Sequence, residues 1–221
     1  MRLERSVEIL IDDQVRKYFT THKFEPHVRG DVRRCLRENA GSMFLWVLLV
    51  TNRLRTLSSS SAGHILKELK SLPRDLISTY EALFRIQLED HRKAITQKLP
   101  WILYACRLLK VEELRDALAM QDYNSEGHAK SFEDWRSCDI PRDLNRNFGT
   151  LVTIDRSTSE VRVRFFHDSL KDAFLGTEDP RSQELTKVCK SSEEELAEIG
   201  SVCLDYLVEV KVSNEIGRAH V

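Results

Sequence analysis

His167 is the side chain whose type and position offer the clearest chemistry in this chain. It lies in the phrase Phe166-His167-Asp168-Ser169, where a strand-like alternation ends and a helical pattern begins. An imidazole beside a helix N-terminus can donate a hydrogen bond to an anionic oxygen, and the helix dipole favours that anion. The alternative is a structural histidine that only joins strand to helix and bonds a backbone carbonyl. The residues alone leave both roles open.

Sequence motifs for phosphate binding and catalysis are otherwise absent. A P-loop needs G-x-x-x-x-G-K-[ST], because its glycines let backbone N–H groups wrap the phosphates and its lysine meets their charge. None of the eight glycines is followed by lysine, and there is no G-x-G-x-x-G, G-x-S-x-G, H-E-x-x-H or cysteine–histidine zinc spacing. We therefore expect no catalytic residue, metal site or cofactor in this chain, and no enzyme activity from it alone.

A β-hairpin is predicted to lead to His167. Residues 151–154 are rich in β-branched side chains, residues 155–160 are polar, and residues 161–165 alternate apolar and basic. Apolar residues then recur at helical spacing after Ser169, and the S-x-x-D phrase that Ser169 begins fits a capping box. A hairpin that runs into a helix beside other helices is the plan of a winged helix.

The rest of the sequence reads as helices. Hydrophobic residues make up 41% and charged residues 31% of the 221 positions, and the formal net charge is −1, which favours a soluble helical protein without a strong field. The longest apolar run, residues 43–50, is too short to span a bilayer, and there is no signal-peptide core. Five scattered cysteines favour reduced thiols, so we predict a cytoplasmic location.

Several boundaries in this helical pattern are open to more than one interpretation. Residues 7–13 could be the last strand of a preceding sheet or the start of a helix. Pro73 could open a helix, and Pro100 predicts a kink or a restart within a helix that begins at Arg92. An amphipathic helix is predicted over residues 193–210, with one apolar face that holds Leu196, Ile199, Val202, Cys203, Tyr206 and Leu207.

Six phrases, in order, resemble fungal NACHT proteins, signalling NTPases related to NOD-like receptors. The phrases are AGSMFLWV at 40–47, LPRDL at 72–76 with Tyr80, WILYACRLL at 101–109 with Glu113-Leu114, GTLV at 149–152, FHDSLKDAFL at 166–175 and the segment 197–207. The resemblance spans about residues 7–210. It departs at Arg107-Leu108-Leu109, where the family has Arg-Pro-Leu, and at Met43, where related receptors have proline near the adenine.

The resemblance implies a mainly α fold with a helical domain, a winged-helix domain with one β-hairpin, and a C-terminal helical spacer. The implied boundaries are the tail end of an NTPase core at 1–25, the helical domain at 26–90, the winged helix at 91–176 and the spacer at 177–212. Residues 213–221 are excluded, because Glu215–Val221 resembles read-through translation of a sequencing adapter. The chain is accordingly expected to be a fragment of a longer gene.

The implied function is that of a regulatory module in a nucleotide-driven switch. His167 would reach the β-phosphate of ADP in the closed state, and the turn at Gly41 and Met43 would face the NTPase core. ADP or ATP would bind only in the intact protein, whose expected partners are its own NTPase core, C-terminal repeats such as ankyrin repeats, and further copies of itself.

Two other functions remain open on the sequence. The first is a winged-helix nucleic-acid binder that uses the basic residues Arg142, Arg146, Arg162 and Arg164. Interleaved acids at Asp143, Asp155 and Glu160 disfavour it. The second is a helical protein-interaction scaffold with no coupling to a nucleotide.

Overall fold

The computed structural model describes residues 2–21, 26–57, 61–126, 131–176, 183–188 and 191–219. Within these ranges the chain is mainly helical and carries one two-stranded antiparallel sheet, which confirms the predicted fold class. The implied boundary between residues 25 and 26 adjoins residues 22–25, which lie outside the described residues.

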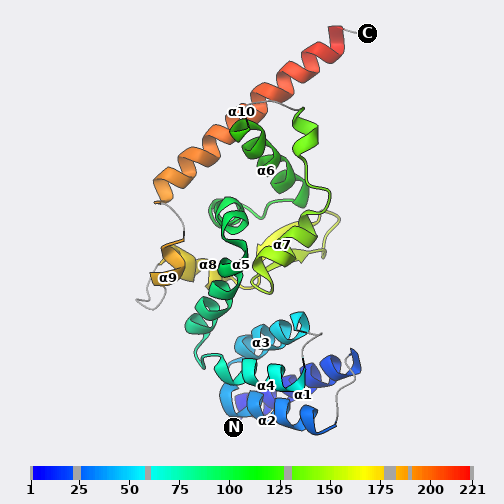
Figure 1. Ribbon diagram of the computed structural model, residues 1–221, viewed down its shortest axis with the longest axis vertical. Helices are drawn as coiled ribbons and strands as arrows, with labels where there is room; N and C mark the ends of the chain where they lie inside the picture. Colours follow the sequence, from blue (N-terminus) through cyan, green and yellow to red (C-terminus); the bar gives the residue numbers. More distant parts are fainter. Residues whose placement is uncertain are drawn as a thin grey trace.

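Four helices form the N-terminal end of the molecule (Figure 1). They are α1 (Arg2–Thr21), α2 (Pro26–Ala40), α3 (Phe44–Thr56) and α4 (Ala62–Ser71). The strand interpretation of residues 7–13 is wrong, because Val7, Ile11, Val15 and Tyr18 recur at helical spacing and are all buried on one face of α1. This stripe packs against α2 and α3.

Helix α5 (Leu76–Tyr104) links this end to the rest of the chain. It begins after Asp75, whose carboxylate accepts the Ser78 N–H at 2.9 Å, so this aspartate and not Pro73 opens the helix. Its one residue with non-helical dihedral angles is His91, directly before Arg92, where the sequence predicted that a helix begins. The backbone keeps helical dihedral angles at Pro100, so the kink or restart predicted there is wrong. Buried residues of α5 on both sides of Pro100 pack in the core.

The hairpin unit follows α5. It contains α6 (Val111–Ser125), the short 3-10 helix η1 (Phe132–Trp135), α7 (Ile140–Phe148), β1 (Val152–Asp155) and β2 (Arg162–Phe165). The strands pair antiparallel with Val152 opposite Phe165, which confirms the predicted hairpin. The Val163 N–H also donates to the Leu109 carbonyl at 2.9 Å, so the chain between α5 and α6 extends the sheet briefly along the other edge of β2.

Three helices complete the fold: α8 (Asp168–Leu175), α9 (Gln183–Thr186) and α10 (Ser192–Ala219). Helix α10 crosses α6 at the end of the molecule opposite α1–α4 (Figure 1). Its apolar face is narrower than predicted: Ile199, Val202 and Tyr206 pack against the core. Leu196 and Leu207 are on the same side of the helix by their spacing but are 51% and 60% exposed, so the core covers only part of the predicted apolar face.

One hydrophobic core connects the two ends of the molecule. It runs from Val7 on α1, through Trp46 on α3 and Leu83 on α5, to Phe174 on α8 and Leu185 on α9. The predicted boundary between residues 90 and 91 coincides with the irregular residue His91, while the core continues across it. The division into the predicted domains therefore stays a prediction.

Candidate functional site

His167 is the N-cap of α8. Its backbone is extended (φ −153°, ψ 151°), and its Nδ1 accepts the backbone N–H of Ser169 at 3.2 Å. The prediction that a capping box begins at Ser169 is wrong. The cap is the histidine two residues earlier, and Ser169 already lies in the first turn of the helix. The structural contact of His167 is thus with an amide N–H and not with a carbonyl.

The capping role uses only one of the two ring nitrogens of His167. The residue is exposed, and no hydrogen bond to Nε2 exists among the residues that the structure describes. The structural and functional roles that the sequence left open are therefore compatible, since Nδ1 holds the helix and Nε2 is free for an outside group. Asp168 follows in the first turn of α8, where its charge is also favoured by the helix dipole.

A hydrogen-bond chain leads from His167 into the core. The Ser169 Oγ lies 2.9 Å from His167 Nδ1 and 3.0 Å from the Tyr80 hydroxyl on α5. Tyr80 is fully buried, and this burial raises the pKa of its phenol, which therefore keeps its proton and remains a donor. An exposed imidazole is thus connected through one serine to a buried phenol on the longest helix described.

The neighbouring residue on α5 connects the same helix to the N-terminal end. Thr79 Oγ1 donates to carbonyls of residues 73 and 75, and Trp46 Nε1 on α3 donates to Pro73 O at 2.9 Å and approaches Thr79 Oγ1 at 3.2 Å. Both Thr79 and Trp46 are fully buried. The first turns of α5 therefore hold polar contacts to α3 through Thr79 and to α8 through Tyr80.

The Gly41–Met43 turn has no comparable connections. Gly41 is exposed at φ +52°, and Met43 is the half-buried N-cap of α3, without a side-chain hydrogen bond to the helix. Among the described residues, no hydrogen bond or ion pair joins this turn directly to His167. The route between them passes through Trp46, three residues after Met43, and then through Thr79 and Tyr80 on α5.

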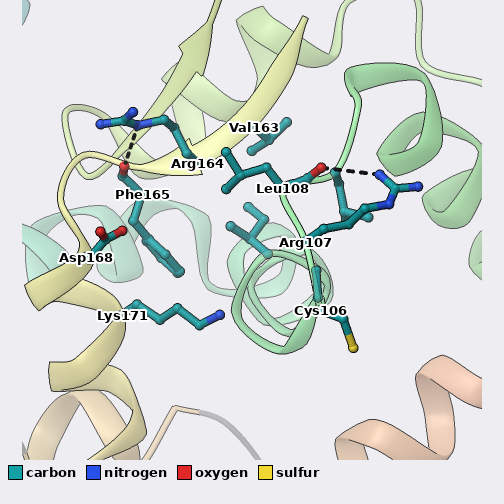
Figure 2. A pocket seen from close by; sticks show the side chains of 11 residues that line it. Cys106, Arg107, Leu108, Val163, Arg164, Phe165, Asp168 and Lys171 are labelled. Atoms are coloured by element: carbon teal, nitrogen blue, oxygen red, sulfur yellow. Dashed lines mark hydrogen bonds between the residues drawn. The ribbon is translucent and has the colours of Figure 1, made fainter. Parts of the chain in front are cut away.

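A cavity of about 260 Å³ lies beside the His167 corner, between the end of α5, strand β2 and α8 (Figure 2). Phe165 and Val163 supply part of its apolar wall, and Lys171 reaches across it toward the chain near Cys106. Arg107 points away from the cavity. The cavity thus combines an apolar surface with two charged residues of α8, the cation Lys171 and the acid Asp168.

Arg107 instead stabilises the start of α6. Its guanidinium donates twice to Glu113, at 2.6 and 2.8 Å, and the same carboxylate accepts the backbone N–H of Lys110 at 2.9 Å. The Arg107 hydrogen bonds lower the pKa of Glu113 from 4.5 to about 2. The Arg and Glu of the phrase at 101–114 therefore have a structural role in this chain.

The basic residues proposed for nucleic-acid binding are partly neutralised by nearby acids. Arg162 binds Glu160 at 2.6 Å, Lys110 also contacts Glu160, and Arg164 lies 3.8 Å from Asp155. The hairpin therefore presents ion pairs instead of a continuous positive surface, which is unfavourable for binding a phosphate backbone.

The sequence did not reveal four residues as part of this network: Tyr80, Ser169, Thr79 and Trp46. In the sequence, Trp46 and Tyr80 stood out only as members of the phrases at 40–47 and 72–80. A signal was available, since a buried tyrosine or tryptophan needs a partner for its polar tip. The identity of that partner depends on contacts between residues 80 and 169, or 46 and 73, which no local pattern reveals.

No helix in the described part of the chain is long and apolar enough to cross a membrane. Over the same residues, no group of three or more histidine, cysteine or acidic side chains is arranged to hold a metal ion. In comparisons with known proteins, no family model, no curated protein and no solved structure matches this chain.

Proposed function

We propose that this chain is the regulatory helical and winged-helix module of a NACHT-type signalling NTPase. In this proposal it couples the nucleotide state of an NTPase core to a closed or an open conformation of the intact protein, a rigid-body two-state change. The core would bind ADP or ATP, while this module would supply a contact to the nucleotide and no catalytic group. The proposal rests on the phrase resemblance together with the geometry at His167.

The observation that supports this proposal most is that the two ring nitrogens of His167 have different surroundings. Nδ1 of His167 is used by the cap of α8, and Nε2 is exposed. The same residue connects through Ser169 to Tyr80, next to the residue that bonds Trp46. A group that binds Nε2 therefore acts on a side chain joined to both ends of the module, which suits a residue that reports the presence of ADP.

The partners follow from this role. The module would contact its own NTPase core when closed, and would release it for assembly with other copies when open. The helix α10 would connect the module to C-terminal repeats. A cytoplasmic location is part of the proposal.

The test is the rate of ADP dissociation from the intact protein, with its NTPase core. A hydrogen bond to a charged acceptor contributes roughly 1.5–3 kcal/mol, which corresponds to about a ten- to hundredfold faster release when it is lost. His167→Ser keeps a side chain that caps helices well but removes the Nε2 donor, so it separates the two roles. We expect faster release and more basal assembly for His167→Ser, and no change for His64→Ala, which alters another exposed histidine in the first turn of α4. Equal rates for wild type and His167→Ser would refute the proposal.

A second candidate function is a helical interaction scaffold without nucleotide coupling. One observation favours it: α10 exposes Leu204 and Val208, 65% and 62% accessible, beside Leu196 and Leu207. Contiguous exposed apolar side chains are typical of contact surfaces. If the scaffold alone is correct, Leu204→Lys impairs assembly while ADP release stays at the wild-type rate in every His167 variant.

A further inference from the structure

The hydrogen bonds around His167 determine which of its ring nitrogens carries the proton. We propose that Tyr80 and Ser169 are positioning residues that hold neutral His167 with its proton on Nε2, facing solvent as a hydrogen-bond donor. The inference deepens the proposed function and rests on it for its significance, because that function needs a donor at Nε2. The tautomer itself is a property of this chain and depends on no ligand.

The first step of the argument concerns Nδ1. A neutral imidazole has one nitrogen that donates and one that accepts. The backbone N–H of Ser169 can only donate, and it points at Nδ1 from 3.2 Å. Nδ1 must therefore carry its lone pair for the cap to exist, and the proton of the neutral ring is left on Nε2.

The second step concerns the direction of the hydroxyl bonds. Ser169 Oγ lies 2.9 Å from Nδ1 and 3.0 Å from Tyr80 Oη, and it has a single proton to share between them. The Tyr80 hydroxyl is fully buried, and Ser169 is its one hydrogen-bond partner among the described residues. A buried phenol that keeps its proton donates where it can, because a buried donor without a partner costs free energy. Tyr80 thus donates to Ser169, and Ser169 is left to donate to Nδ1.

The third step is the consequence of removing Tyr80's hydroxyl. Without that donor, Ser169 Oγ can turn and accept a proton from Nδ1, so the second tautomer becomes available at the expense of the cap. A ring that exchanges between tautomers offers Nε2 as a donor for only part of the time. Tyr80, although buried and far from His167 in sequence, therefore controls what the exposed side of the ring presents.

The experiment is nitrogen-15 NMR of the histidine rings in the 221-residue chain, at mildly alkaline pH where imidazoles are neutral. The His167 signals are assigned from their loss in His167→Ser. In the wild type we expect Nε2 to show the protonated shift and Nδ1 the unprotonated shift. In Tyr80→Phe we expect the two shifts to converge, as the Nδ1-protonated form gains population several-fold. In Ser169→Ala we expect the wild-type shifts, because the backbone N–H of residue 169 still donates to Nδ1 and no hydroxyl is left to accept a proton from it.

Two controls make the assignment specific. Tyr80→Phe combined with Ser169→Ala removes the hydroxyl that could accept from Nδ1 and should restore the wild-type shifts. Tyr18→Phe removes a different buried tyrosyl hydroxyl, on α1, and should leave the His167 signals unchanged. If Tyr80→Phe does not fold, the tautomer of His167 in the wild type decides the question.

Either of two results would overturn the inference. One is a mixture of tautomers at His167 in the wild type. The other is an unchanged His167 spectrum in folded Tyr80→Phe. A third result would separate the tautomer from the proposed function. If the proton stays on Nε2 but substitution of His167 does not change the ADP release rate, the tautomer is established and the proposed function is rejected.

Discussion

The turn at Gly41–Met43 and the corner at His167 both lead the chain into a helix, but different chemistry fixes them. Gly41 turns the chain through a positive φ of 52°, and the cap at Met43 uses no side-chain hydrogen bond. At His167 the cap is the imidazole itself, and Ser169 and Tyr80 extend it into the core. The first turn redirects the backbone, whereas the second also fixes the chemical state of an exposed side chain.

This difference shows which of two exposed turns is suited to report on a ligand. A ligand contact at the Gly41–Met43 turn would meet backbone, the exposed Ser42 side chain and a thioether, and neither of these side chains caps the helix that follows. A contact at His167 engages one nitrogen of a ring whose other nitrogen holds a helix end.

The largest effect is expected beneath the His167 corner. Phe174 on α8 is 4% exposed and packs edge-on against Phe84 at 4.9 Å between ring centroids, with Phe165 at 5.7 Å. Phe174→Ala should lower the free energy of unfolding by about 3–5 kcal/mol, because it leaves a cavity in this aromatic cluster. Denaturant unfolding measures the loss, with Leu175→Ala as the control, since Leu175 is 42% exposed. Equal losses for the two variants would show that α8 is not anchored by its aromatic ring.

Acid should weaken the hairpin unit through Glu113. Its pKa is lowered from 4.5 to about 2, so the ion pair stabilises the fold above pH 4.5, and this contribution is lost as the pH falls toward 2. Because the pair is partly exposed, Glu113→Gln should cost only about 1 kcal/mol at neutral pH.

The check on Glu113 is the difference in unfolding free energy between wild type and variant, followed across pH. The difference should shrink steadily below pH 4.5. Glu112→Gln is the matched control, since Glu112 is more exposed and pairs only within its own helix turn. A pH-independent difference for Glu113→Gln would contradict the assigned ion pair with Arg107.

A similarly small effect is expected at the Gly41 turn. Gly41→Ala should destabilise the fold by about 1 kcal/mol, because a side chain at positive φ is strained even where space is open. Gly30 in α2 is also surrounded by open space but is helical, so Gly30→Ala should stabilise by about 0.5–1 kcal/mol. Thermal unfolding of both variants checks the opposite signs. A stabilising Gly41→Ala would mean that the turn needs no left-handed residue.

Much of the fold could be predicted because its signals are local. The β-branched and alternating runs at 151–165 encode the hairpin, and the apolar spacing after Ser169 encodes α8. The failures were also local, and they have physical causes. Residues 7–13 form a helix because their buried stripe continues to Tyr18, and Leu196 and Leu207 of α10 are exposed because the core covers only part of the predicted apolar face.

The site could be predicted only in part. His167 was selected from the sequence because it stands where a strand ends and a helix begins. Its role as the cap could not be distinguished from that of Ser169, because both residue positions suit a helix start. The link to Tyr80 spans 89 residues and arises from the packing of α8 on α5, which is a tertiary property.

The most direct test of the central claim, that Tyr80 acts on a nucleotide through His167, is a double-mutant cycle on the ADP release rate of the intact protein. Tyr80→Phe should accelerate release in the wild-type background and have no effect in the His167→Ser background, so that the coupling energy is at least about 1 kcal/mol. Additive effects of the two substitutions, or no effect of either, would contradict the account.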